Sequence, residues 1–124
     1  MLLEDFYKVE NTTTSLEGDH TAILRINNSH HLYNGHFPHR PVTPGVMLMQ
    51  LFKEDAERTC GKTLYLKKAV NVKFMAVVDP NEDPQLVLEY SLENIDGELG
   101  LKGVARHKGA IAIKFNARYG YKES

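Results

Sequence analysis

One segment of the chain has the pattern of a helix that is apolar on nearly every side, and this limits the available folds. Threonine can cap a helix and proline suits its first position, so a helix is predicted to begin at Thr43-Pro44. It should run to about Cys60, because Gly61 can take the left-handed conformation that follows many helices. Residues 46–52 are apolar nearly all round, which indicates burial on most sides.

Strand patterns flank this helix. Residues 6–11 and 20–27 have the character of strands, and residues 28–43 break all periodicity. Four further strands are marked by apolar residues: Val70, Val72, Phe74 and Ala76; Leu86, Leu88, Tyr90 and Leu92; Leu99 and Leu101; and Ile111, Ile113, Phe115, Ala117 and Tyr119. Turns at Asp96-Gly97 and Lys108-Gly109 predict antiparallel hairpins. We expect an α+β fold, a highly curved antiparallel sheet of about six strands around one central helix.

Length and composition exclude several classes of protein. The 124 residues fit a single domain, 1–124, and the formal net charge of -1 gives no global reason to expect a nucleic acid or a membrane surface as partner. The lone Cys60 cannot form an intramolecular disulfide and has the character of a small buried residue, and the first residues do not form a signal peptide. No stretch approaches the ~20 apolar residues of a membrane span. A cytoplasmic protein is the simplest interpretation.

A stiff loop that runs into the helix is the segment that carries chemistry. Pro38, Pro41 and Pro44 restrict the loop and should hold His36 in a fixed place. The first N–H groups of the helix, at about Gly45 and Val46, have no partner within the helix and point outward. An imidazole beside free N–H donors suits removal of a proton next to a carbonyl, since the donors can hold the oxygen as charge develops there.

The run Gly35-His36-Phe37-Pro38, followed by Pro41-Val42 and Pro44-Gly45-Val46, closely resembles the hotdog-fold 3-hydroxyacyl-acyl-carrier-protein dehydratases of fatty acid synthesis. The resemblance implies that His36 removes the C2 proton and that the N–H groups near Gly45 and Val46 bind the thioester carbonyl. Phe37 and Pro44 would contact the substrate. It also implies a homodimer, or a higher oligomer built from it, with the site between subunits, and it implies neither cofactor nor metal.

The sequence departs from this family at the second catalytic position. The family carries a Glu or Asp fourteen residues after the histidine, and this chain carries Gln50. An amide can hydrogen-bond a hydroxyl but cannot protonate it at neutral pH. Glu54 lies one helical turn on, where many members carry Gln, so the two residues look exchanged. A displacement of about 5.4 Å along the axis separates them. Glu54 either supplies the carboxylate or is solvated or ion-paired in the polar second half of the helix, residues 53–58.

Other candidate sites were weighed against structural roles. His30, His31, His36 and His39 cluster in sequence, but no cysteine is near and the carboxylates are not at ligand spacing, so a metal site is not expected. Lys62, Lys67, Lys68 and Lys73 form either a solvated strand edge or a docking patch for an acidic acyl carrier protein. Met47 and Met49 belong to the core or line an acyl tunnel.

Three functions remain open from the sequence. The leading one is conversion of a 3-hydroxyacyl thioester, on acyl carrier protein or CoA, to the trans-2-enoyl thioester, with His36 as base and Gln50 or Glu54 acting on the leaving hydroxyl. Gln50 favours a second interpretation, a subunit that binds acyl carriers without catalysis. A hotdog thioesterase is the third, and Glu54 would be its nearest carboxylate for activating water.

Overall fold

The computed structural model describes residues 5–34 and 42–122, with Leu32 and Asn34 described for their backbone only. Its strands are β1 (Tyr7–Thr14), β2 (Asp19–Ile26), β3 (Leu64–Phe74), β4 (Gln85–Ile95), β5 (Glu98–His107) and β6 (Ala110–Tyr121). A short 3-10 helix, η1 (His31–Asn34), and one α-helix, α1 (Gly45–Cys60), lie between β2 and β3.

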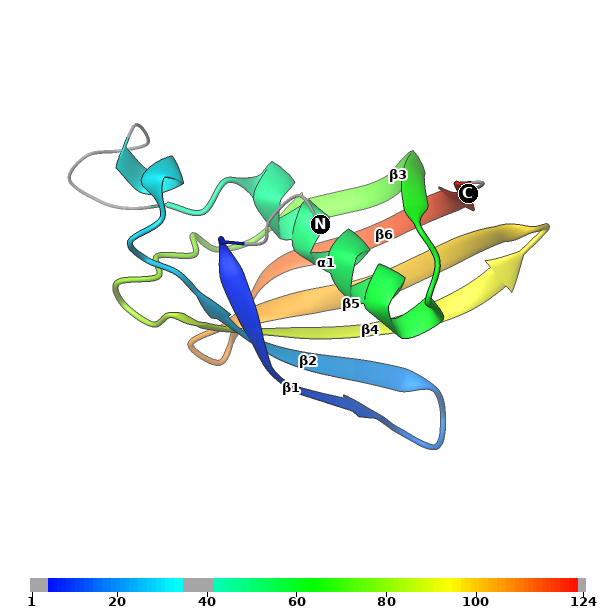
Figure 1. Ribbon diagram of the computed structural model, residues 1–124, viewed down its shortest axis with the longest axis horizontal. Helices are drawn as coiled ribbons and strands as arrows, with labels where there is room; N and C mark the ends of the chain where they lie inside the picture. Colours follow the sequence, from blue (N-terminus) through cyan, green and yellow to red (C-terminus); the bar gives the residue numbers. More distant parts are fainter. Residues whose placement is uncertain (1–4, 35–41, 123–124) are drawn as a thin grey trace.

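The strands form one antiparallel sheet in the order β1-β2-β4-β5-β6-β3. Helix α1 lies along one face of this sheet, and the strands curve past it on both sides (Figure 1). The helix connects β2, near one edge, to β3, which forms the other edge. The predicted architecture, six antiparallel strands around one helix, is confirmed.

The predicted C-terminal end of the helix and the hairpins are confirmed, whereas the helix begins at Gly45, one residue after the predicted first position at Pro44. Gly61 follows the helix with φ of 70°, and its N–H donates to the Glu57 carbonyl at 2.9 Å. Asp96 and Lys108 adopt positive φ, as does the glycine after each of them. Two successive positive φ values are typical of the two-residue hairpin turns that match the twist of paired strands.

The core lies between α1 and the inner face of the sheet. Phe52 is fully buried, and its ring centroid lies 5.5 Å from that of Phe115 on β6 and 6.3 Å from that of Tyr90 on β4. The predicted inward residues of β4 and β6 are buried as well, including Leu86, Leu88, Phe115, Ala117 and Tyr119. The apolar first half of the helix therefore meets the sheet through one aromatic cluster.

Replacing Phe52 with alanine should destabilise the fold by about 3–5 kcal/mol, because the change removes a large buried side chain and leaves a cavity. Urea unfolding at fixed protein concentration measures this as a lower midpoint. Leu16→Ala, at a fully exposed turn position, is the control and should stay within about 0.5 kcal/mol of the native value. A loss below about 1 kcal/mol in Phe52→Ala would contradict the packing described here.

The prediction that the second half of the helix emerges into solvent is wrong for three residues. Glu54, Asp55 and Ala56 are buried, with exposed fractions of 1%, 3% and 0%. The cause is tertiary, because hydroxyl groups from β1 and β4 reach the two carboxylates and satisfy them. Only the face formed by Lys53, Glu57 and Arg58 is left partly or fully exposed.

Two local predictions also need correction. The strand after the helix was expected around Val70–Ala76, but β3 runs from Leu64 to Phe74 and contains a bulge between Ala69 and Asn71. The predicted threonine cap is absent as well: helix α1 has no side-chain cap bond, and the Thr43 hydroxyl pairs instead with the Tyr33 hydroxyl at 2.8 Å.

Among residues 5–34 and 42–122, no helix is long and apolar enough to cross a membrane.

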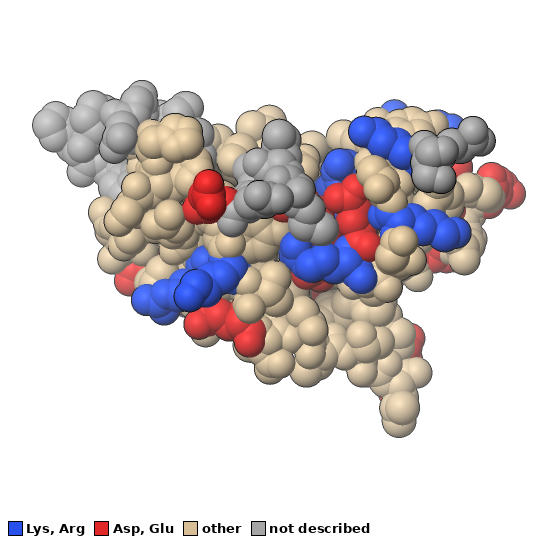
Figure 2. Space-filling model, in the orientation of Figure 1, with Lys and Arg blue, Asp and Glu red and all other residues tan. Residues whose placement is uncertain are grey.

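Met47 and Met49 are half-buried against the core, and Cys60 is a half-buried free thiol. On the face of the molecule shown in Figure 2, acidic and basic side chains lie intermingled.

Candidate active site

The segment with the predicted catalytic histidine, residues 35–41, lies outside the described residues, so the structure does not test the roles of His36 and Phe37. The chain on either side of it is fixed. Tyr33 and Thr43 are buried and bonded to each other through their hydroxyl groups. The Thr43 N–H donates to the Val78 carbonyl at 2.9 Å. Burial raises the pKa of the Tyr33 hydroxyl, so this pair stays neutral.

The start of helix α1 is the predicted carbonyl-binding site, and its backbone bonds begin at Met47. The N–H groups of Met47 and Leu48 donate to the Pro44 carbonyl at 3.0 and 3.3 Å. The N–H groups of Gly45 and Val46 belong to the first turn of the helix, whose donors have no acceptor within the helix itself. Val46 is 70% exposed, so this first turn can be reached from outside the chain.

Phe74, at the end of β3, lies directly against Gly45. A Cβ on Gly45 would overlap the Phe74 ring, so only glycine allows this close approach. The ring itself is 57% exposed. It therefore forms an apolar wall beside the donors of the first turn, a suitable surface for the hydrocarbon part of an acyl thioester.

Gln50 and Glu54 meet as the i and i+4 positions of a helix do. The Gln50 Nε2 group lies 3.0 Å from Glu54 Oε2, and the Tyr7 hydroxyl of β1 donates to Glu54 Oε1 at 2.8 Å. Gln50 is half-buried and Glu54 is buried. Of the two residues that look exchanged, the amide is the one nearer to solvent.

A polar network continues from Glu54 to the rest of the helix. Arg58 donates to the Tyr7 hydroxyl at 2.7 Å and to Asp55 at 3.0 Å, and Asp55 also accepts the Tyr90 hydroxyl at 2.5 Å. Burial raises the pKa of Tyr7 to about 12, with the Glu54 carboxylate adding to the shift and Arg58 opposing it. Tyr7 therefore remains a protonated donor at physiological pH. Its part in the site was not predicted, because it lies 47 positions from Glu54 in the sequence.

A groove of about 550 Å³ opens beside Gln50. The other residues that line it are polar or glycine: Lys53, Glu57, Gly61, Lys62, Thr63 and Lys122. A volume of this size is in the range of small-molecule sites. Gln50 is therefore accessible to a ligand, whereas Glu54 does not line this groove.

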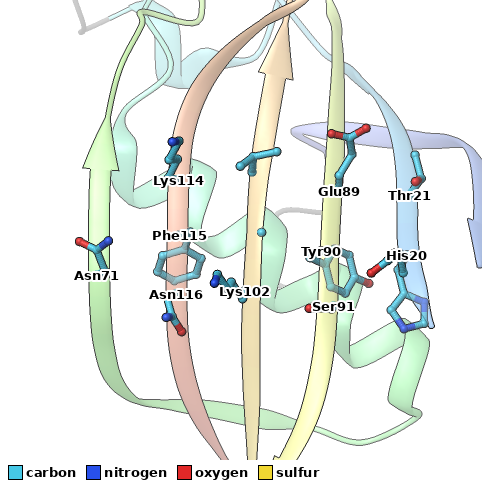
Figure 3. A pocket seen from close by; sticks show the side chains of 13 residues that line it. His20, Thr21, Asn71, Glu89, Tyr90, Ser91, Lys102, Lys114, Phe115 and Asn116 are labelled. Carbon is cyan, nitrogen blue, oxygen red and sulfur yellow. The ribbon is translucent and has the colours of Figure 1, made fainter. Parts of the chain in front are cut away.

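A second cleft, of about 610 Å³, lies on the opposite, outer face of the sheet and contains none of the predicted site residues. Figure 3 shows its side chains on β3, β6, β5, β4 and β2, among them Asn71, Asn116, Lys102 and Lys114. Lysines, amides and the Glu89 carboxylate line it together with Tyr90, Val104 and Phe115.

The predicted lysine patch is divided in the structure. Lys67 forms an ion pair with Glu98, and Lys62 lies over the Tyr121 ring at 4.7 Å. Lys73 sits opposite Lys114 in the β3–β6 register, and Lys68 opposite Arg118. Among the predicted histidines, His30 and His31 stack on each other at 4.3 Å, while His36 and His39 lie outside the described residues.

One helix enclosed by a six-stranded antiparallel sheet, with the helix start beside the edge strand β3, defines a hotdog fold. The family model described as ApeI-like, ApeI dehydratase, matches residues 11–110. The chain therefore belongs to the ApeI-like dehydratase family.

Curated relatives agree with this assignment. The 3-hydroxyacyl-acyl-carrier-protein dehydratase FabZ of Ligilactobacillus salivarius is 36% identical over 89 residues, which cover 65% of this chain and 62% of the relative. That of Variovorax paradoxus is 29% identical over 103 residues, which cover 75% and 64%. The matched part thus spans less than two thirds of these two dehydratases. That of Burkholderia mallei is 33% identical over 77% of this chain and 69% of the relative.

Solved structures share the fold. The dehydratase heterocomplex ApeI:P from Xenorhabdus doucetiae superposes with a TM-score of 0.71 at 16% identity, covering 91% of this chain and 96% of that one. A hypothetical thioesterase with coenzyme A from Streptococcus pneumoniae gives 0.65 at 12% identity, covering 98% of both chains. At such identities the likeness establishes the fold alone.

Proposed function

We propose that the protein converts 3-hydroxyacyl thioesters, carried on acyl carrier protein or CoA, to trans-2-enoyl thioesters in the synthesis of a fatty acid or a related lipid or polyene. The observation that carries the proposal is the match of residues 11–110 to a dehydratase family. Within that range, the sequence motif that contains His36 comes just before helix α1. A spectrophotometric hydration assay with crotonyl thioesters tests the reverse reaction, and absence of turnover in the native protein would end the proposal.

Three groups of the chain take roles in this reaction. His36 removes the C2 proton, and the N–H groups of Gly45 and Val46 hold the thioester oxygen as it becomes enolate-like. Gln50 hydrogen-bonds the 3-hydroxyl. The C3–O bond then breaks, and because an amide cannot supply the missing proton, the proton taken from C2 returns from the His36 imidazolium to the departing oxygen as water forms.

Chain connectivity supports the position of His36. Three residues of chain reach at most about 11 Å, and His36 is three residues after Tyr33. Tyr33 is bonded to Thr43, two residues before the helix start at Gly45. The anchored pair therefore limits how far from the helix start the imidazole can lie.

We propose further that the chain pairs with a second copy along β3, placing Gln50 of one subunit near His36 of the other. Strand β3 is an edge of the sheet and eleven residues long, and a long apolar edge strand is a template for pairing with another chain. Its exposed apolar side chains include Leu66 (43%), Val70 (47%) and Phe74 (57%). The same edge borders the helix start, because Phe74 touches Gly45.

Sedimentation velocity should show a dimer for the native chain and a monomer for Leu66→Lys/Val70→Lys, since charges on an edge strand oppose pairing. Leu16→Lys, in the exposed turn between β1 and β2, is the control and should remain dimeric. A double variant that stays dimeric would exclude β3 as the interface. A monomeric native chain would favour pairing with a different chain, since the dehydratase ApeI:P from Xenorhabdus doucetiae is a heterocomplex.

Specific observations bear on two other functions. Gln50 in place of an acid favours a subunit that binds acyl carriers without dehydrating them. Hydrolysis would need Glu54 to activate water, but Glu54 is 1% exposed and bonded to Tyr7, a poor position for that role. Release of free thiol, followed with a disulfide reagent, identifies hydrolysis directly.

A further inference from the structure

Glu54 and Tyr7 constrain which end of the Gln50 amide can face a substrate. Arg58 has only donors, so the Tyr7 hydroxyl accepts from Arg58 and gives its single proton to Glu54. An ionised carboxylate can only accept. The atom of Gln50 that lies 3.0 Å from Glu54 must therefore be the donor Nε2, and the amide oxygen Oε1 is turned elsewhere.

We infer that Glu54 is a positioning residue: it fixes the Gln50 amide so that Oε1 and the second N–H are presented to the groove beside the helix, where Oε1 accepts a hydrogen bond from the 3-hydroxyl of the substrate. The catalytic consequence rests on the proposed dehydration. The orientation itself rests only on the observed network, which ties the amide to β1 through Tyr7 and to the next helical turn through Arg58.

Burial explains why this arrangement holds. Glu54 is 1% exposed, so water does not compete for its oxygens, and Gln50 is half-buried at the border of the groove. In a low-dielectric setting a hydrogen bond to a charged acceptor is stronger than one between neutral groups. Without the carboxylate, the amide of Gln50 can rotate and offer either end to a ligand.

The exchange of residues therefore has a structural meaning. In the common family order a carboxylate faces the substrate and a Gln stands one turn behind it. In this chain the Gln50 amide lines the groove and the Glu54 carboxylate lies one turn further along the helix, but the two side chains still form a hydrogen bond. The carboxylate thus acts on the substrate through Gln50 and not as an acid.

The side-chain amide signals of Gln50 in a ¹⁵N-labelled sample test this orientation without any need for turnover. They are assigned by their loss in Gln50→Met. In the native protein the two N–H protons should differ clearly in chemical shift, with one protected from exchange with water. In Glu54→Gln, whose amide can accept or donate, this difference and the protection should fall toward the values of free glutamine.

Asp55→Asn is the matched control, because it makes the same carboxylate-to-amide change at the next position of the helix, where burial is similar. Asp55 is hydrogen-bonded to Arg58 and Tyr90 and not to Gln50. Asp55→Asn should leave the Gln50 signals near their native values. Native-like Gln50 signals in Glu54→Gln, or an equal change in Asp55→Asn, would overturn the inference.

If the native protein catalyses the dehydration, Glu54→Gln should also lower kcat by about 10- to 100-fold with little change in KM. An absence of native turnover would refute the proposed function but leave the amide result decisive.

Discussion

Exchanging the two helix residues, Gln50→Glu with Glu54→Gln, should raise the rate of dehydration by about 10²–10⁴-fold, the usual contribution of one positioned acid. The double variant restores the family's common order. Its hydrogen bonds can be remade without loss: Tyr7 donates to the new amide oxygen at 54, and the new Nε2 donates to the carboxyl group at 50. The acid then faces the groove that Gln50 lines in the native protein.

Initial rates with a 3-hydroxyacyl thioester, compared at equal protein concentration, measure this gain. Glu54→Gln alone is the first control and should lose activity, because the Gln50 amide is no longer held in its native orientation. Gln50→Glu alone is the second control, and it places two carboxylates side by side. Like charges at that separation raise the pKa of one of the pair, so this single variant should also gain activity. A double variant no faster than the native protein would show that the missing acid does not limit the reaction.

His36→Ala should lower turnover by about 10²–10⁴-fold, since the imidazole is both the base that accepts the C2 proton and the only group proposed to return it. The substrate-binding surfaces at the helix start are unchanged in this variant, so KM should move far less than kcat. His39→Ala, three residues further in the same segment, is the matched control and should retain native activity. Equal losses in both variants would point to a general disturbance of the loop, and undiminished turnover in His36→Ala would remove the histidine from the mechanism.

Local sequence signals predicted much of the architecture. Helix α1 ends where the Gly61 signal places it and begins one residue after the predicted first position at Pro44, and both hairpin turns form at the expected dipeptides. These features depend on residues that are neighbours in the chain. The start of strand β3 was predicted six residues too far along the chain. Its first half, Leu64–Lys68, has no clear alternation of apolar and polar residues, and its bulge near Val70 breaks the period of two.

The candidate site was predictable only in part, for a similar reason. The contact between Gln50 and Glu54 follows from helical spacing, and the structure shows it. The burial of Glu54 does not follow, because it depends on Tyr7, which reaches the helix from a strand at the start of the chain. A polar run of residues 53–58 is typical of a solvated face, and only tertiary contacts reveal that two of its carboxylates are satisfied inside the protein.

The same long-range contacts give the Gln50 amide a defined orientation. An isolated amide on a helix surface would be free to present either end. Here a buried carboxylate, itself held by Tyr7, allows one orientation. The geometry therefore favours a site that still recognises a hydroxyl group, and the proposed function assigns all proton transfer to His36.

The mass of a 3-hydroxyacyl chain on acyl carrier protein, followed by mass spectrometry during incubation with the native protein, tests the central account most directly. Elimination of the hydroxyl between an imidazole and the amide start of helix α1 predicts a carrier species lighter by one water, still joined through its thioester. A carrier that loses its whole acyl group, or one whose mass never changes, would contradict it.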